Sequence, residues 1–220
     1  MIKCVNIHKS YKSGHSRRAI LRGIDFSVDR GEKIGLIGRN GAGKSTLIKQ
    51  IGGVEYPDSG KIIRNMTVSW PIGFSGGFQG SLTGYDNARF IARVYGTYYS
   101  DIRGFVEEFT ELGSALTRPV KTYSSGMRAR LAFALSLAID FDCYLIDEVM
   151  LVGDQIFRNK CHDELFVKRA HCAMIIVSHD MNTIRKYCNR ALFLEGGVAR
   201  EYDTVDLAIQ AYEGMSRMAG

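Results

Sequence analysis

The chain has 220 residues, of which 45% are hydrophobic and 24% charged, and these proportions are ordinary for a soluble globular protein with a sizeable core. Its formal net charge is +6, but the basic residues are scattered and form no run of five or more. A solvated basic surface therefore explains the charge better than a nucleic-acid or anionic-membrane site does.

The cysteines and the N-terminus bear on the cellular compartment. The five cysteines are odd in number and show no paired spacing, which favours a reducing compartment over a disulfide framework. The first residues, MIKCVNIHKSY, lack the apolar core of a signal peptide, and no segment approaches the roughly 18 apolar residues of a membrane span. We therefore expect a cytosolic protein that meets a membrane only through a partner.

Two segments near the N-terminus alternate between apolar and polar residues, as antiparallel strands do: IKCVNIHKSY at 2–11 and ILRGIDFSVDRGE at 20–32. Later segments are short and apolar throughout, as strands buried on both faces of a parallel sheet are. These are KIGLI at 33–37, CYLI at 143–146, AMIIV at 173–177 and ALFLE at 191–195. Helical stretches separate them, so we expect an α/β fold with an antiparallel β piece beside its core.

The strand at 33–37 leads directly into GRNGAGKST, residues 38–46, which a helical segment follows. Glycines let the backbone wrap around phosphate groups, Lys44 can reach the β and γ phosphates, and Ser45 can offer a hydroxyl to Mg²⁺. Such spacing arises by chance in roughly one chain in a hundred of this length. The predicted phosphate ligands are Gly38, Asn40, Gly41, Ala42, Gly43, Lys44, Ser45 and Thr46.

Between Thr83 and about Leu116 the pattern becomes helical. The apolar residues there form two stripes, Phe90, Ile91 and Val94, and Phe105, Phe109 and Leu112. We interpret this part of the chain as a helical insert in the α/β core.

Two carboxylates, Asp147 and Glu148, end the predicted strand in CYLIDE. Because ligands of a parallel sheet bind off the carboxyl ends of its strands, both side chains should face the nucleotide. Asp147 would hold Mg²⁺ through water, and Glu148 would orient and activate the attacking water. Taken alone, the pair would be better explained as solvated acids, and the upstream phosphate loop reverses that preference.

A histidine, His179, follows the next apolar strand in IIVSHD and should lie at the same edge of the sheet. There its imidazole can hydrogen-bond a γ phosphate. A single histidine is more often structural, and adjacent residues in SHD cannot form a catalytic triad. Its position after the strand is the reason for including it.

A helix that starts with YSSGM precedes the strand that ends in Asp147. With the other motifs in this order, the chain resembles the nucleotide-binding subunits of ABC transporters, whose signature usually reads LSGGQ. The resemblance covers essentially the whole chain. It implies a RecA-like P-loop ATPase core with an N-terminal antiparallel β piece and an inserted α-helical subdomain. It also implies one nucleotide-binding domain, with 1–78 and 140–220 as the core and 79–139 as the helical subdomain.

The resemblance implies ATP and Mg²⁺ as cofactors and adds further site residues. By resemblance, Tyr11 stacks on adenine, Gln79 senses the metal and the membrane partner, and Asp154 is the D-loop aspartate. Ser124 and the N–H groups near Gly126 would close over a γ phosphate held by Lys44 of a second copy, so a head-to-tail homodimer is implied. The catalytic residues are then Glu148, His179 and Lys44, and the metal ligands are Ser45, Gln79 and Asp147.

Two stretches, SWPIGFSGGFQGSLTGYDNARF and DEVMLVGDQIFRNKC, are similar to the ATPase subunits of bacterial polysaccharide exporters of the capsule type. The chain ends at Gly220 without room for the carbohydrate-binding domain that O-antigen exporters often carry. This similarity implies an ATPase on the cytoplasmic face of the inner membrane, bound through its helical insert to integral-membrane permease subunits. It also implies that the chain binds no nucleic acid and makes no direct contact with the sugar. The alternatives are another polysaccharide, O-antigen or small-solute transporter and, less favoured, a soluble ATPase acting on nucleic acid.

Overall fold

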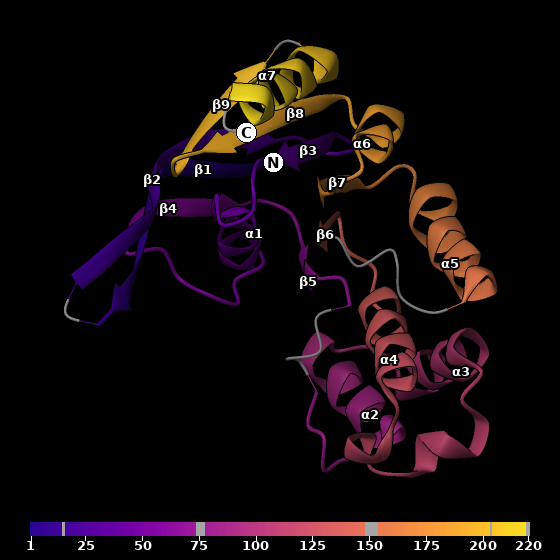
Figure 1. Ribbon diagram of the computed structural model, residues 1–220. Coiled ribbons are helices and arrows are strands. Elements are labelled where there is room, and N and C mark those ends of the chain that lie inside the picture. Colours follow the sequence, from indigo (N-terminus) through magenta and orange to yellow (C-terminus); the bar gives the residue numbers. More distant parts are fainter. Residues whose placement is uncertain (15, 74–77, 148–153, 203, 219–220) are drawn as a thin grey trace. The chain divides into compact units, whose positions relative to one another are not determined.

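The computed structural model describes residues 1–14, 16–73, 78–147, 154–202 and 204–218. The chain divides into two compact units, whose elements are labelled in Figure 1. Unit 1 comprises Met1–Pro71, Phe141–Glu148 and His171–Gly220, and unit 2 comprises Ile72–Asp140 and Val149–Ala170. The expected helical subdomain, residues 79–139, belongs to unit 2.

A three-stranded antiparallel sheet begins unit 1, with strand order β2-β1-β4. Its strands are β1 (Ile2–Ser13), β2 (Ser16–Val28) and β4 (Ser59–Arg64). Apolar residues at alternating positions, such as Ile2 and Cys4, are buried, while the side chains between them are exposed. The predicted antiparallel piece is thus confirmed, and its alternation has the expected cause, one buried and one solvated face.

A six-stranded sheet forms the centre of unit 1, in the order β5-β6-β7-β3-β8-β9. Its strands are β3 (Lys33–Ile37), β5 (Val68–Pro71), β6 (Cys143–Asp147), β7 (Ala173–Val177), β8 (Arg190–Glu195) and β9 (Val198–Tyr202). Neighbours are parallel except β8 and β9. The four apolar segments expected to be strands are β3, β6, β7 and β8, and the predicted α/β fold class is confirmed.

Helices cover both faces of this sheet, which explains why its central strands are apolar throughout. On one face, α1 (Lys44–Ile51) shares a hydrophobic core with the antiparallel sheet and with Ile34 and Leu36 of β3. On the other face, α6 (Met181–Tyr187) lies so close to β3 that a Cβ at Gly35 would be 2.7 Å from Ile184. Helix α7 (Val205–Met218) packs beside it, with ring contact between Tyr212 and Phe193 of β8.

Unit 2 is helical. Its α-helices are α2 (Gly84–Tyr95), α3 (Tyr99–Thr110), α4 (Ser125–Leu137) and α5 (Gln155–His162), with 3-10 turns at Gly113–Thr117 and Val120–Thr122 and a π-helix at Asp163–Lys168. Thr83 and Asp86 start α2 with reciprocal side-chain to backbone hydrogen bonds, a capping box. In the part of the chain that the structure describes, no helix has the length and apolar content to cross a bilayer.

The two predicted stripes differ in their surroundings. Phe109 is buried and its ring contacts Phe157, which in turn contacts Phe133, so the second stripe reaches the core of unit 2. The first stripe divides, because Ile91 is buried while Phe90 is 53% and Val94 58% exposed. Of the predicted stripe, only Ile91 belongs to the inward face of α2. That face consists of Gly84, Asn87, Ala88, Ile91 and Ala92, at helical spacing.

One carboxylate, that of Asp142, joins the starts of β5 and β6 in unit 1. Its Oδ2 accepts from the N–H of Thr67 at 2.8 Å and from the hydroxyl of Thr67 at 3.1 Å, and both of its oxygens accept from the guanidinium of Arg30. These hydrogen bonds, the Thr67 N–H foremost and then Arg30, lower the pKa of Asp142 below its usual range.

We predict that Asp142→Asn lowers the free energy of unfolding by about 1–3 kcal/mol at pH 7, because it weakens charge-assisted hydrogen bonds at the sheet edge. A carboxyl whose pKa is lower in the folded state than in the unfolded state stabilises the fold at pH values above its unfolded-state pKa of about 3.9. This stabilisation is lost as the pH falls through the folded-state pKa. The difference from wild type should therefore narrow below about pH 4 in urea unfolding curves. Asp140→Asn, at an aspartate whose side chain is 95% exposed, is the control and should change little; equal losses in both variants would contradict this role for Asp142.

Candidate functional site

The loop between β3 and α1 is built on glycines that no other residue can replace without strain. A Cβ at Gly38 would lie 2.4 Å from the backbone oxygen of Leu194 in β8. Gly43, which precedes α1, has a φ of 107°, and a Cβ there would lie 2.9 Å from a side-chain carbon of Leu21. Because Gly43 has no side chain to cap the helix, the first N–H groups of α1 stay available to an anion.

Lys44 is the first residue of α1 and only 6% exposed. Its Nζ donates to the backbone oxygens of Gly38 at 2.7 Å and Arg39 at 3.2 Å, so the ammonium lies within the curve of the loop. The amine adds a full positive charge to the N–H groups of the helix start. This combination suits a polyphosphate.

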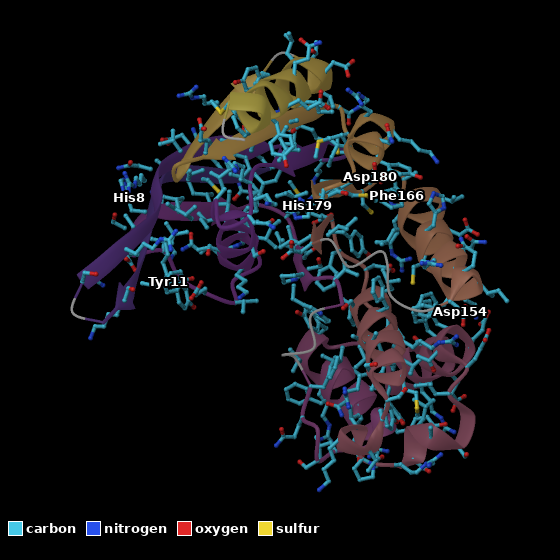
Figure 2. All side chains as sticks on the ribbon, viewed as in Figure 1. His8, Tyr11, Asp154, Phe166, His179 and Asp180 are labelled. Atoms are coloured by element: carbon cyan, nitrogen blue, oxygen red, sulfur yellow. The ribbon has the colours of Figure 1, made fainter. Side chains whose placement is uncertain are left out.

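A pocket of about 270 Å³ opens at this loop. Its lining comes from β1, β2, the loop, α1 and the segment after β7, with Tyr11, Ile20, Asn40, Gly41, Gly43, Lys44, Ser45, Thr46 and His179. All of these except Ile20 were singled out from the sequence, and Figure 2 labels Tyr11 and His179 among the side chains of unit 1. An aromatic ring, an ammonium, hydroxyls and backbone N–H groups around one cavity match the base and the phosphates of a nucleotide.

The strand order places the other predicted residues of unit 1 at the same sheet edge. Strands β6, β7 and β3 are parallel neighbours, and Asp147 ends β6, His179 follows β7 by two residues, and Gly38 follows β3. Asp147 is partly exposed and does not line the pocket. Glu148, the predicted base, lies outside the described residues, so its position stays a prediction.

Tyr11 is held by a residue that the sequence did not indicate. Its hydroxyl donates to Glu55 Oε2 at 2.5 Å, and the ammonium of Lys9 lies 5.5 Å from the centre of its ring. Burial, and next the hydrogen bond to the Glu55 carboxylate, raise the pKa of Tyr11, so the phenol keeps its proton and remains the donor. The sequence did not indicate Ile20 either. The alternation of a strand does not show which of its partly buried residues will lie beside a loop that is distant in the sequence.

The remaining predicted site residues belong to unit 2. Ser124 caps α4, its hydroxyl accepting from the N–H of Met127 at 3.2 Å, and among the described residues a Cβ at Gly126 would meet only that hydroxyl, at 4.0 Å. Asp154 caps α5 and pairs with Arg130 at 2.6 Å. Gln79 is exposed, and its backbone N–H donates to the Asn87 side chain at 3.0 Å.

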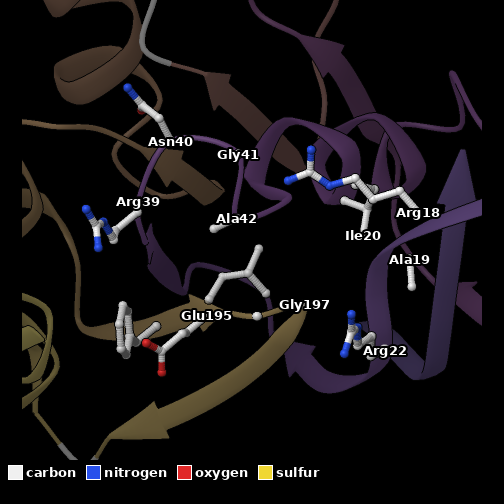
Figure 3. A pocket seen from close by; sticks show the side chains of 13 residues that line it. Arg18, Ala19, Ile20, Arg22, Arg39, Asn40, Gly41, Ala42, Glu195 and Gly197 are labelled. Atoms are coloured by element: carbon white, nitrogen blue, oxygen red, sulfur yellow. The ribbon is translucent and has the colours of Figure 1, made fainter. Parts of the chain in front are cut away.

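A second pocket, of about 310 Å³, shares Ile20, Asn40 and Gly41 with the first and is drawn in Figure 3. The charged residues that line it are Arg18, Arg22, Arg39 and Glu195. Cations thus outnumber the single carboxylate in its lining. Their field favours the approach of an anionic ligand to the glycine loop next to them.

Comparison with known proteins places these features in a family. The ABC transporter profile matches residues 21–150. The capsule polysaccharide export ATP-binding protein CtrD of Neisseria meningitidis serogroup B is 52% identical over 215 residues, which cover 98% of this chain and 100% of that protein. The ATP-binding protein BexA of Haemophilus influenzae is also 52% identical, over 96% of this chain and 98% of its own length.

Solved structures agree on the fold. The ATP-binding cassette MJ0796, in a dimeric post-hydrolysis state with ADP and Pi, matches with a TM-score of 0.77 at 21% identity, covering 92% of this chain and 98% of that one. The pocket, the strand order and the relatives' names agree on a nucleotide as ligand, and the resemblance inferred from the motifs is confirmed. The chain belongs to the ABC transporter family, among its ATP-binding proteins.

Proposed function

We propose that this chain is the ATP-hydrolysing subunit of an exporter that moves lipid-linked capsular polysaccharide across a bacterial inner membrane. The pocket that joins Tyr11, the glycine loop and His179 carries the nucleotide part of the proposal. Likeness to CtrD, named as a capsule polysaccharide export protein, over the full length of that protein supports the cargo.

In the bound state, the Tyr11 ring stacks on adenine and the loop N–H groups surround the phosphates. The Lys44 ammonium exchanges its contacts to the carbonyls of Gly38 and Arg39 for the β and γ phosphate oxygens. No large movement of the loop is needed, because Lys44 already lies inside it.

The residues present fit Mg²⁺, which prefers oxygen ligands. The Ser45 hydroxyl is exposed in the pocket and Asp147 is partly exposed at the same sheet edge, so both oxygens are open to a hydrated ion. When bound, the ion neutralises charge on the β and γ phosphate oxygens.

Hydrolysis follows from the residues beyond the strand ends. Glu148 orients a water and takes its proton as the water oxygen bonds to the γ phosphorus. The bond from phosphorus to the β–γ bridging oxygen breaks at the same time, which yields ADP and phosphate. His179 donates a hydrogen bond to the γ phosphate and stabilises the charge that develops there.

The γ phosphate is covered by a second copy of the chain in a head-to-tail homodimer. The start of α4 supplies an anion site from that copy, because Ser124 and the N–H groups near Gly126 open a helix whose first turn holds no acidic residue. The copy that supplies Ser124 also supplies Asp154, which approaches the glycine loop of the other copy. Closing around ATP and opening after hydrolysis drive the transport cycle.

Permease subunits hold the protein at the cytoplasmic face of the membrane. Helix α2 presents Phe90, 53% exposed, and Val94, 58% exposed, one turn apart on one side, while Tyr95 in its last turn is 40% exposed and Tyr98 beyond it is 81% exposed. Such an aromatic patch is typical of an interaction site. We assign it to the permease, within the helical insert where the resemblance expects that contact.

Glu148→Gln should bind ATP and dimerise but hydrolyse it at least about 100-fold more slowly, because the amide cannot take the proton. Turnover is measured with the permease present, and nucleotide binding is measured separately as the control. Rapid hydrolysis by this variant would remove Glu148 from its role.

Mixing Lys44→Ala with Ser124→Asp subunits should restore ATP-dependent dimerisation that neither variant shows alone. Aspartate still caps α4 but brings a negative charge to the γ phosphate, whereas a mixed dimer keeps one intact site. Ser124→Asn, a neutral cap, is the matched control and should dimerise. Light scattering of each variant and of the mixture measures this, and a mixture no better than its components argues against sharing of the site between copies.

Phe90→Asp should reduce co-purification of the permease about tenfold or more, because it places a charge in the centre of an apolar contact. Binding of ATP should stay unchanged. Ile156→Asp, at a residue of α5 in the same unit that is 75% exposed, is the control. Equal losses for the two variants, or no loss for Phe90→Asp, would rule out this patch as the docking site.

A further inference from the structure

The segment after α1, residues 54–58, is attached to strand β1 at several points. The N–H groups of Val54 and Glu55 donate to the oxygen of Lys49 at 2.9 and 3.3 Å, which ties the segment to the end of α1. Further along, the N–H of Asp58 donates to the oxygen of His8 at 2.8 Å, and the Asp58 carboxylate accepts from both the N–H and the hydroxyl of Ser10. Glu55 is thus carried on a backbone that is held on both sides of it.

The side chain of Glu55 is half-buried and accepts the hydroxyl of Tyr11 at 2.5 Å. Tyr11 is 38% exposed and lies near the end of the β1–β2 hairpin, where the residues that follow it, Lys12 and Ser13, are exposed as well. An aromatic side chain in such a place would turn among its rotamers if nothing held it. The hydrogen bond to a fixed carboxylate removes that freedom.

Lys9 adds a second constraint on the same ring. Its ammonium lies over the Tyr11 ring at 5.5 Å from the centre, donates to the oxygen of Tyr56 at 2.7 Å and lies 3.6 Å from an Asp58 carboxylate oxygen. The Lys9 side chain is only 13% exposed, and its contacts with Tyr56 and Asp58 hold the ammonium against segment 54–58. One face of the ring is therefore covered, and a stacking partner must use the other.

We propose that Glu55 is a positioning residue for the nucleobase: by holding the Tyr11 hydroxyl, it fixes the ring as a platform before the nucleotide arrives. This inference rests on the proposed function, in which Tyr11 stacks on adenine. Glu55 contributes to ATP affinity without touching the nucleotide, since ordering a free side chain on binding costs affinity and a ring that is already ordered avoids that cost. The phosphates are held by the loop and do not depend on Glu55.

The test compares ATP with tripolyphosphate, which has the phosphates but no base, by calorimetry on the full-length protein. Glu55→Ala should weaken ATP binding about 3- to 10-fold and leave tripolyphosphate binding unchanged. Glu55→Gln, whose amide oxygen still accepts the phenol, should retain most of the affinity. Glu213→Ala, at an exposed glutamate of α7, is the control and should bind both ligands as wild type does.

Tyr11→Phe keeps the ring and loses only the hydroxyl, so it should reproduce the ATP-specific loss. Both substitutions break the hydrogen bond between Tyr11 and Glu55, and Tyr11→Phe also removes the hydrogen bond between the Tyr11 hydroxyl and the Thr46 side chain, so the double variant should lose no more than Tyr11→Phe alone. If Glu55→Ala fails to fold, as judged by its thermal unfolding, Tyr11→Phe carries the comparison instead.

Equal loss of ATP and tripolyphosphate binding, no loss at all, or additive losses in the double variant would overturn the inference. A failure of the proposed function has a different signature. Wild type would then bind neither ligand, or Lys44→Ala would bind tripolyphosphate as well as wild type does, whatever residue stands at position 55.

Discussion

The close approach between the glycine loop and strand β8 is the constraint on which the site depends. With only 2.4 Å between a Cβ at Gly38 and the Leu194 oxygen, the chain can turn out of β3 toward α1 only with a glycine at position 38. That turn leaves the N–H groups of α1 uncapped and brings the buried ammonium of Lys44 into the same curve. Positive charge and N–H donors are thereby concentrated in one place, which stabilises phosphate more than any neutral ligand.

The strand order extends this local geometry along the edge of the sheet. Parallel strands end at the same edge, so residues far apart in the sequence, such as Asp147 at the end of β6 and His179 after β7, lie at the edge of the sheet where the loop leaves β3. The arginine-lined pocket adds positive potential on a shared wall of the loop. Binding and hydrolysis in unit 1 and the cap of α4 in unit 2 are then parts of one proposed cycle between two copies.

Much of the fold and part of the site follow from the sequence. Strands β3, β6, β7 and β8 were predictable because strands covered by helices on both faces must be apolar, and the loop because glycines and a lysine at that spacing have few other uses. The burial of α2 was not, since Phe90 and Val94 are as apolar as Ile91 and only tertiary packing decides which of them faces inward. Glu55 was unpredictable for a similar reason: its role depends on a segment folding back onto a strand more than forty residues earlier in the chain.

The most direct measurement of the central claim is an experimental structure of Glu148→Gln with bound ATP and Mg²⁺. The account predicts two inverted copies, with each γ phosphate lying between Lys44 of one copy and the hydroxyl of Ser124 of the other. A closed complex in which the Ser124 segment lies away from every γ phosphate, in a form that hydrolyses ATP once Glu148 is restored, would contradict it.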